Sequence, residues 1–397
     1  MPDTGRHYLA IPGPSVMPDA VLQAMHRPAP NIYTGEIHDI TRSLVPDLCA
    51  VARTAGHVAM YIGNGHAMWE ASLTNVLSRG DKVLALVNGR FGEGWANVAD
   101  ALGAQVQRID FGLCAAPDPA RVQQALAADT AQSIKAVTVT HVDTATSALA
   151  DVSAIRQAMD AAGHPALLMV DCVASLACDR FEMDAWGVDV AISASQKGLM
   201  TPPGMGFIFC NDRARRAGAT ANCRTPYWDW APRIDADEVY RYFDGTSPTH
   251  HIFALRKALD MIHDEGIEQV WARHDLFARA YWAAFDAWGQ GGSMRINMTD
   301  PATRSRAVTT LRLDPPQGTA LREWLIDKAG VTLGIGLGMV PPGDPAADGY
   351  FRVAHMGHVN MNMVMGVIGA MDAGMKALGI AHGERAADAA AQVMASA

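Results

Sequence analysis

Short apolar runs alternate with longer amphipathic segments through most of the chain. Most of the runs have no polar face, which is typical of strands in a parallel sheet that helices cover on both sides. The predicted strands span residues 82–87, 104–109, 134–140, 166–171, 188–194 and 206–211. Between them, residues 118–132 and 151–164 have helical spacing, and Asp151 is suited to capping the second of these helices. The pattern predicts an α/β domain with a mostly parallel sheet.

After roughly residue 275 the pattern changes, and a smaller α+β domain is predicted. Strands at 307–313 and 349–355 flank a helix at 318–330. The long apolar segment 361–380 predicts an amphipathic helix that closes the chain.

We expect three parts in the chain: an N-terminal arm at 1–20, a large domain at 21–275 and a small C-terminal domain at 276–397. A helical region at 266–289 joins the two domains. The segment 214–250 is rich in aromatic, charged and proline residues and is predicted to be an unusually long loop. Loops of that length are often functional.

Composition excludes two classes of partner. The chain has 397 residues, 49% of them hydrophobic, and a formal net charge of −9, so it has no basic excess for nucleic acid or an anionic membrane. Its six cysteines are scattered without a CxxC pair, as is typical of reduced thiols in the cytoplasm. The first residues lack the apolar core of a signal peptide, and no segment reaches membrane-spanning length. We therefore expect a cytoplasmic protein of enzyme size.

Lys197 lies in the stretch ISASQKGLMTPPGMGF, between a strand-like run and a turn rich in proline and glycine. Its neighbours are small, hydroxylic or apolar, and burial among such groups disfavours the charged form of a lysine. The neutral amine that results is a nucleophile of the kind that forms Schiff bases. The alternative is an ordinary strand-end lysine whose stem packs while its ammonium reaches water.

A second feature is a turn upstream of Lys197. Gly63, Asn64, Gly65 and His66 come directly before a predicted helix that begins near Ala67. Exposed amides at a helix N-terminus bind phosphate, and glycines let the anion approach the backbone. A simple capping turn is the alternative interpretation.

Asp171 ends a strand of the buried type in ALLMVDCVASL. Open α/β sheets bind ligands at the carboxyl ends of their strands. A carboxylate there could pair with a protonated ring nitrogen, as pyridoxal enzymes require, or it could cap the next helix. The interval to Lys197 is long enough for one helix and one strand, which would place both side chains at the same edge of the sheet.

Two more strand ends offer suitable groups. Phe91, in LVNGRFGEGW, could stack on a planar cofactor or belong to the core. The stretch VTHVDTATSALADV ends another strand with His141, Asp143, Thr144 and Thr146, which could form a polar cluster at the same edge or a simple turn. A phosphate cradle, a stacking ring, a buried carboxylate and a strand-end lysine are together the parts that a pyridoxal phosphate (PLP) site needs.

Five motifs carry a resemblance over nearly the whole chain: PGPSVMP, GNGHAMWEASL, VNGRFGEGW, VDCVASL and SASQKGLMTPPGMGF. Together they resemble the class V aminotransferases of fold type I, particularly the alanine/serine–glyoxylate aminotransferase branch. The resemblance implies pyridoxal 5'-phosphate as cofactor and a homodimer with its active sites at the interface. It also implies ping-pong transfer of an amino group from a small L-amino acid, such as serine or alanine, to a small 2-oxo acid such as glyoxylate or pyruvate.

The resemblance assigns roles to individual residues. It makes Lys197 the lysine of the internal aldimine with PLP and Asp171 the partner of the pyridine nitrogen. Arg352, in FRVAHMGH, matches the arginine that binds the substrate α-carboxylate, a task that suits its guanidinium fork. Ser15, in PGPSVMP, is a second candidate for substrate binding.

The remaining matched positions are expected to contact the cofactor. Phe91 occupies the stacking position, and Thr144 falls where a hydroxyl meets the phenolic oxygen. Thr246 matches a threonine that reaches the phosphate of the neighbouring subunit. The other residues expected to contact the cofactor's phosphate or ring are Asn64, Gly65, His66 and Gln196.

The chain also departs from the pattern of the resemblance. Phe243 stands where alanine–glyoxylate enzymes often have a phosphate-binding tyrosine, and residues 29–36 replace a histidine-and-arginine stretch of many serine–glyoxylate enzymes. The residues HMGHVN after Arg352 are similar to pyridoxamine–pyruvate aminotransferase, which has a glutamate at the position of Asn64. Use of that vitamer as a free substrate is the alternative activity.

Three other interpretations are disfavoured. A desulfurase or lyase would need a reactive cysteine near the C-terminal domain, and none follows Cys223. A binding module without turnover would not need Lys197, Asp171 and Arg352 together. We expect no metal site, because His355 and His358 have no carboxylate or thiolate near them at ligand spacing.

Overall fold

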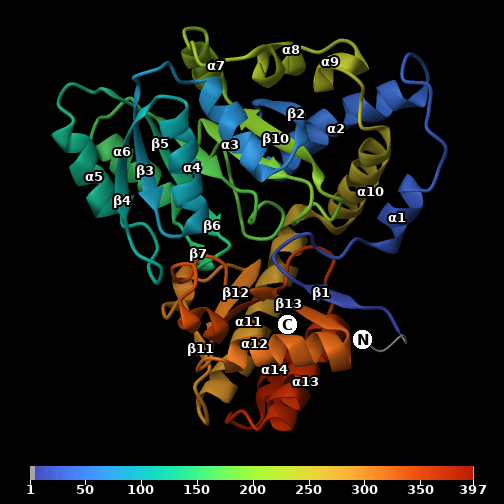
Figure 1. The fold of residues 1–397 in the computed structure, drawn as a ribbon. Coiled ribbons are helices and arrows are strands. Elements are labelled where there is room, and N and C mark those ends of the chain that lie inside the picture. Colours follow the sequence, from blue (N-terminus) through green and yellow to red (C-terminus); the bar gives the residue numbers. More distant parts are fainter. Residues whose placement is uncertain (1–4, 397) are drawn as a thin grey trace.

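The computed structural model describes residues 5–396, which form two lobes that are each built on a sheet (Figure 1). In spatial order, the seven strands of the larger sheet are β2 (His57–Gly63), β10 (Gly204–Cys210), β9 (Val190–Ala194), β8 (Leu167–Asp171), β5 (Ile134–Thr140), β3 (Lys82–Val87) and β4 (Gln105–Asp110). The strands from β9 to β4 run parallel, and β10 runs antiparallel to both of its neighbours. The predicted α/β fold with a mostly parallel sheet is confirmed.

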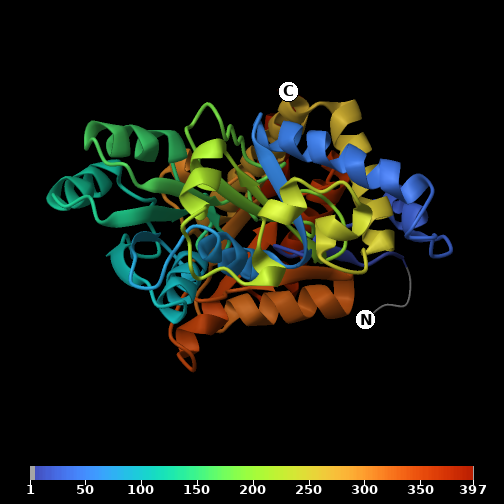
Figure 2. The same ribbon diagram turned by 90° about the horizontal axis from the view of Figure 1, so that it is seen from above.

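Helices cover both faces of this sheet. Alternate side chains of β10 divide between two cores, because successive residues of a strand point to opposite faces: Phe207 and Phe209 lie in one core, and Ile208 in the other. The first core includes residues of α2 (Glu36–Ala52), α5 (Pro119–Ala128), α6 (Val152–Ala161) and α10 (Thr249–Glu265). The second includes residues of α3 (Gly65–Thr74), α4 (Arg90–Ala101) and α7 (Asp212–Gly218). Figure 2 shows the larger lobe from above, with the strands between these helix layers.

The smaller lobe has a five-stranded sheet with its own core. Its strands, in spatial order, are β1 (Tyr8–Ala10), β13 (Val331–Ile335), β14 (Tyr350–Ala354), β12 (Val308–Arg312) and β11 (Arg295–Ile296). Its helices are α11 (Ile267–Gly289), α12 (Gln317–Trp324), α13 (Met361–Leu378) and α14 (Ala386–Ala395). The N-terminal arm therefore belongs to this lobe through β1, which pairs in parallel with β13.

One helix spans the junction of the two lobes. Val270 of α11 packs in a core of the larger lobe, whereas Phe277 and Trp288 of the same helix pack in the core of the smaller lobe. The predicted boundary at residue 275 falls inside this continuous helix, and the domain limits stay a prediction.

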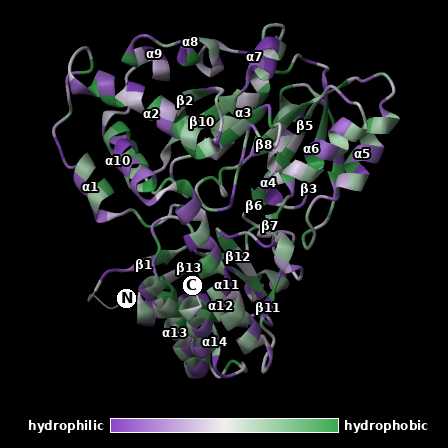
Figure 3. Ribbon diagram, turned by 180° about the vertical axis from the view of Figure 1, so that it is seen from behind, coloured by the Kyte–Doolittle hydropathy of each residue, from purple (hydrophilic) through white to green (hydrophobic). Residues whose placement is uncertain are grey.

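In Figure 3 the strand ribbons are mostly hydrophobic, and α10 carries both colours, as expected of an amphipathic helix. Within residues 5–396, no helix is both long enough and apolar enough to span a bilayer.

The remaining elements are short. They are α1 (Asp19–Met25), the two-stranded ladder of β6 (Val142–Asp143) and β7 (Ala148–Leu149), the helical turns η1 (Pro226–Trp228), α8 (Ala231–Ile234), α9 (Val239–Phe243), η2 (Pro301–Thr303) and η4 (Pro345–Gly349), and the π-helical turn η3 (Leu325–Ala329). Segment 214–250 therefore holds several short helices, and its prediction as a loop was wrong.

Two further differences concern helices. No helix lies between β8 and β9, where one was expected, because the intervening residues 172–189 form turns. A second helix, α14, follows α13, so the predicted closing helix is not the last. The alanine-rich α14 packs against α11 through Ala390 and Met394 in the small-lobe core.

Candidate active site

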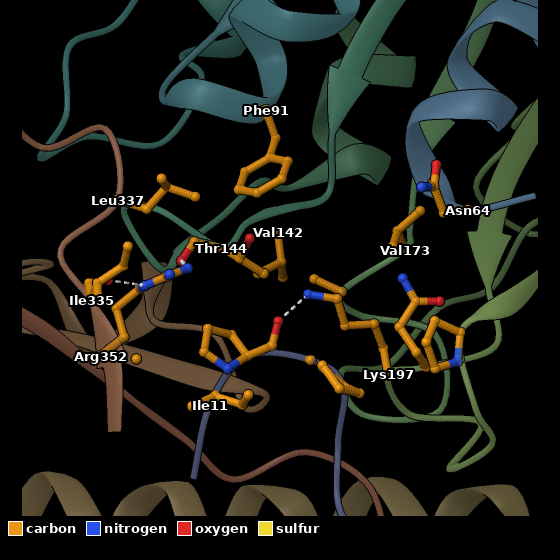
Figure 4. A pocket seen from close by; sticks show the side chains of 18 of the residues that line it. Ile11, Asn64, Phe91, Val142, Thr144, Val173, Lys197, Ile335, Leu337 and Arg352 are labelled. Atoms are coloured by element: carbon orange, nitrogen blue, oxygen red, sulfur yellow. Dashed lines mark hydrogen bonds between the residues drawn. The ribbon is translucent and has the colours of Figure 1, made fainter. Parts of the chain in front are cut away.

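Two neighbouring parallel strands position the lysine and the carboxylate. Strand β8 ends at Asp171, which pairs with Ile192 of β9, and Lys197 follows shortly after the end of β9. Both side chains are buried and line one cavity of about 580 Å³. Figure 4 shows Lys197 in this cavity. The prediction that these two residues lie at the same edge of the sheet is confirmed.

The Lys197 amine lies in an environment that disfavours its charge. Burial, and then the positive charge of Arg352, lower the pKa of Lys197 to about 8. Its Nζ donates a hydrogen bond to the carbonyl oxygen of Pro12 (Figure 4). A large fraction of the amine is therefore neutral at slightly alkaline pH, which is the form that acts as a nucleophile or a base.

The N-terminal segment that covers Lys197 depends on a glycine. Gly13 has a φ of +91°, and a Cβ there would lie 2.7 Å from Lys197 Cδ and Cε. Any larger residue would therefore collide with the lysine stem and would also adopt an unfavourable backbone conformation. Next in the segment, Ser15 donates its hydroxyl to the carbonyl oxygen of Lys197 at 2.7 Å.

The carboxylate of Asp171 is held in a fixed orientation by two donors. Trp69 Nε1 donates to its Oδ2 at 2.7 Å, and the Val173 amide donates to its Oδ1 at 2.8 Å. Burial raises the pKa of Asp171 to about 6, although both hydrogen bonds act in the opposite direction. The group can therefore accept a hydrogen bond from, and share a proton with, a ring nitrogen placed in the cavity.

The N-terminus of α3 faces the same cavity. The Asn64 side chain accepts from the Ala67 amide at 3.2 Å, so Asn64 caps the helix. Gly65 and His66 also line the cavity, and their amides precede the first hydrogen bond of the helix ladder. Gln196, beside Lys197, has a buried Oε1 that accepts no hydrogen bond from any described residue.

Aromatic rings form one wall of the cavity. Phe91 extends into it from the first turn of α4 (Figure 4), and its ring centroid is 6.2 Å from those of both His66 and Trp69. Asp143 holds this turn, because its Oδ2 accepts from the Phe91 amide at 2.7 Å. Asp143, a member of the polar cluster predicted after β5, therefore caps helix α4.

Arg352 lies at the other side of the cavity, on strand β14 (Figure 4). Its Nε donates to the Ile335 carbonyl at 2.7 Å and its Nη1 donates to the Thr144 carbonyl at 2.9 Å. Burial lowers the pKa of Arg352 to about 10, which still leaves it charged at neutral pH. Because Nη2 donates to no described residue, a ligand carboxylate can bind there.

The cavity brings together most of the predicted site residues: Asn64, Gly65, His66, Phe91, Thr144, Asp171, Gln196, Lys197 and Arg352. Thr246 and Ser15 do not line it. Thr246 is exposed, in the short connection between α9 and α10, and Ser15 is buried behind Lys197. Phe243 is buried in the core of the larger lobe.

Among the cavity residues that sequence reasoning missed are Trp69 and Arg322. Trp69 follows His66 by three positions on α3, so both side chains lie on one face of the helix, and this spacing was a usable signal. Arg322, on α12, carried no local signal, because its place depends on how the smaller lobe packs against the larger one.

The chain is similar to known aminotransferases over nearly its whole length. The chain is 36% identical to serine–glyoxylate aminotransferase of Methylorubrum extorquens, over 92% of this chain and 90% of the relative. It is 32% identical to L-aspartate–glyoxylate aminotransferase of Paracoccus denitrificans, over 95% and 93% of the two chains. The structure of pyridoxamine–pyruvate aminotransferase from Mesorhizobium loti superposes with a TM-score of 0.88 and 23% identity, covering 100% of this chain and 99% of that one. At that identity the structural likeness shows the fold alone.

The family model for class V aminotransferases matches residues 63–342, which include both strand ends, the N-terminus of α3, and Arg322. This match covers more than half of the chain, and the relatives above span nearly all of it. The predicted family is thus confirmed: the chain belongs to the class V aminotransferases, which have the fold type I architecture.

Proposed function

We propose that the protein transfers an amino group from a small L-amino acid to a small 2-oxo acid such as glyoxylate, with PLP held by the residues of the cavity. The observation that carries the proposal is the convergence of Lys197, Asp171 and Arg352 on one enclosed space. The two named relatives share glyoxylate as a substrate and differ in the amino donor, serine in one and L-aspartate in the other.

The cavity residues fit PLP. The amides of Gly65 and His66 would bind its phosphate at the N-terminus of α3, where the helix dipole favours an anion. Gln196 has an unpartnered buried oxygen, and the Asp171 carboxylate is oriented by Trp69 toward a position where the pyridine nitrogen would lie. Phe91 would face the ring.

When bound, PLP supplies an electron sink for the negative charge that develops as the substrate's α-carbon loses its proton. Lys197 would hold the cofactor through its amine in the resting enzyme. Once the amino donor displaces it, Lys197 would move the proton from the α-carbon, a task that its lowered pKa of about 8 suits. The Pro12 carbonyl would orient this amine.

Asp171 would keep the pyridine nitrogen protonated. Trp69 and Val173 donate to the two carboxylate oxygens, so the carboxylate would keep its orientation when a ring nitrogen is bound beside it. Arg352 would bind the α-carboxylate of the donor and later of the acceptor at the same place, because both half-reactions use one site. Its bonds to the Ile335 and Thr144 carbonyls fix the guanidinium in advance.

We further propose a homodimer in which Thr246 serves the cofactor phosphate of the partner subunit. Thr246 is exposed and lies outside the cavity of its own chain, which fits a role toward another subunit. Ser15 would act on Lys197 through its hydrogen bond to the lysine carbonyl, and its role as a substrate-binding residue stays a prediction.

The experiment that tests the function follows the absorbance of lysine-bound PLP in the purified protein. L-serine, L-alanine, L-aspartate or pyridoxamine is added singly, and glyoxylate or pyruvate is then added to restore the starting spectrum. We expect an amino acid to discharge the lysine-bound form and a 2-oxo acid to restore it. A spectrum that responds to pyridoxamine and to no amino acid would favour the alternative activity.

Two variants make this experiment specific. Lys197→Ala is expected to abolish the lysine-bound absorbance and turnover together. Lys135→Ala is the matched control, because Lys135 lies at the opposite, amino end of β5 and should leave both unchanged. Retention of the lysine-bound absorbance in Lys197→Ala would overturn the assignment.

A further inference from the structure

The cavity contains a second arginine besides Arg352. Arg322 reaches it from α12 of the smaller lobe and is half-buried there. Arg352 comes from strand β14 of the same lobe, so both positive charges lie on the substrate side, across from the phosphate cradle of α3. The α-carboxylate of a substrate needs only one of them.

Arg322 has no hydrogen-bond or ion-pair partner among residues 5–396, although the charges of Glu323 and Asp348 raise its pKa against the effect of burial. None of its nitrogens forms a hydrogen bond or an ion pair with a described group, and its Nε is buried without an acceptor. The nearby Asp348 instead accepts from Thr319 at 2.7 Å. A guanidinium has N–H donors and no acceptor, and leaving the buried Nε donor unpaired is unfavourable. Arg352, by contrast, donates to two backbone carbonyls.

The two guanidinium groups also repel each other. Burial lowers the pKa of Arg322, and the charge of Arg322 contributes to lowering the pKa of Arg352. Arginine nevertheless keeps its charge at neutral pH. A ligand with one carboxylate, bound at Arg352, would leave Arg322 unpaired. A ligand with two carboxylates would satisfy both groups and remove the repulsion.

The wall of the cavity near Arg322 is partly apolar and partly polar. Leu333, Ile335 and Leu337 line this side together with Thr332, which carries a hydroxyl. The charge of Arg322, and not the character of the wall, therefore favours a second carboxylate on the ligand.

We propose that Arg322 binds the side-chain carboxylate of the amino donor, so that the donor is a short dicarboxylic L-amino acid such as L-aspartate. This inference rests on the proposed aminotransferase function and names the class of its donor. The cofactor phosphate is an unsuitable occupant, because its cradle lies on α3 of the larger lobe. Glyoxylate is unsuitable as well, because its single carboxylate would take the place at Arg352.

Single-turnover kinetics of the PLP-bound enzyme test the proposal. The rate of discharge of the lysine-bound form is measured against concentration for L-aspartate, L-serine and L-alanine. In Arg322→Gln, the second-order rate constant for L-aspartate should fall about 10- to 100-fold, the loss expected for a charge-assisted carboxylate contact, while that for L-alanine changes little. Arg322→Lys should recover part of the rate with L-aspartate only. Lys328→Gln removes an exposed positive charge just after α12 and should leave the preference unchanged.

A binding measurement gives a readout that is independent of turnover. Succinate has two carboxylates and no amine, and calorimetry should show it binding the PLP-bound enzyme more tightly than propionate. Arg322→Gln should remove this difference. If the wild type discharges with serine or alanine as fast as with aspartate, and Arg322→Gln affects all donors equally, the inference is wrong and the aminotransferase function stands. If no amino acid discharges the lysine-bound form, the proposed function itself fails.

Discussion

Trp69 donates its indole N–H to Asp171 Oδ2 at 2.7 Å and thereby ties helix α3 to the carboxyl end of strand β8. The same helix presents Gly65 and His66 to the cavity from its first turn. One side chain thus fixes the distance between the phosphate cradle and the carboxylate proposed to hold the ring nitrogen. Because a ligand that binds both must match this distance, Trp69 acts as a positioning residue.

Replacing Trp69 by Phe keeps a ring in place and removes the hydrogen bond. That bond lowers the pKa of Asp171, so its loss should raise this pKa further above the present value of about 6. We expect turnover to fall about tenfold and the acid side of the pH–rate profile to move to higher pH. Trp95→Phe is the matched control, because the Trp95 Nε1 is buried without a partner and the same change removes no hydrogen bond. An unchanged acid side in Trp69→Phe would show that the bond does not tune Asp171.

Lys197 should destabilise the cofactor-free protein at neutral pH. Its pKa is about 8 in the folded chain and near its usual 10.5 when unfolded, so the unfolded state binds the proton more tightly. The penalty is full below pH 8 and disappears as the pH rises to 10.5. Lys197→Met should therefore be about 1–3 kcal/mol more stable to urea than the cofactor-free wild type at pH 7. The difference should shrink toward pH 10.5, and a difference that does not depend on pH would contradict this account.

Periodicity predicted six of the seven strands of the larger sheet, because most of them are apolar throughout, but it missed the edge strand β2. Asp171 and Lys197 could be placed at one edge from the strand order alone, since parallel strands end on the same side. The three residues of β1 were not predicted, because their pairing with β13 joins segments far apart in the chain. Turns likewise occupy residues 172–189, where the interval between Asp171 and Lys197 leaves room for a helix.

Features that depend on packing between the lobes could not be predicted from local patterns. Arg322 lies on an ordinary amphipathic helix, and nothing in its neighbourhood in the sequence distinguishes it from a surface arginine. The contact between Pro12 and Lys197 similarly joins the N-terminal arm to the strand edge of the other lobe. The glycine of IPGPS could be read in the sequence. The reason that a glycine is needed there is the close approach of Gly13 to the Lys197 side chain, which only the structure shows.

Gly13→Ala should therefore impair the site through steric contact. The new Cβ would lie 2.7 Å from Lys197 Cδ and Cε, at a φ of +91° that already disfavours alanine. We expect a loss of about 1–3 kcal/mol in stability, together with weaker PLP binding, because the arm must move away from Lys197. Gly5→Ala is the control for backbone strain alone, because Gly5 has a φ of +82° and nothing within 4 Å of its Cβ position. Equal PLP affinity in the two variants would show that the arm does not hold the lysine.

The proposed homodimer can be tested through Thr246, which is exposed and lies outside its own cavity. Thr246→Ala should weaken PLP binding about tenfold, as expected when a hydrogen bond to a charged group is lost, without changing the oligomeric state measured by light scattering. Thr220→Ala, at another exposed threonine, should leave PLP affinity unchanged.

Hybrid dimers of one Thr246→Ala chain and one Lys197→Ala chain then decide which subunit Thr246 serves. If it serves the partner's site, one site of each hybrid carries both substitutions and the other carries neither, so the active site should bind PLP with wild-type affinity. If Thr246 serves its own chain, the site that retains Lys197 in the hybrid also carries Thr246→Ala. That site should then bind PLP with the weakened affinity of the Thr246→Ala variant.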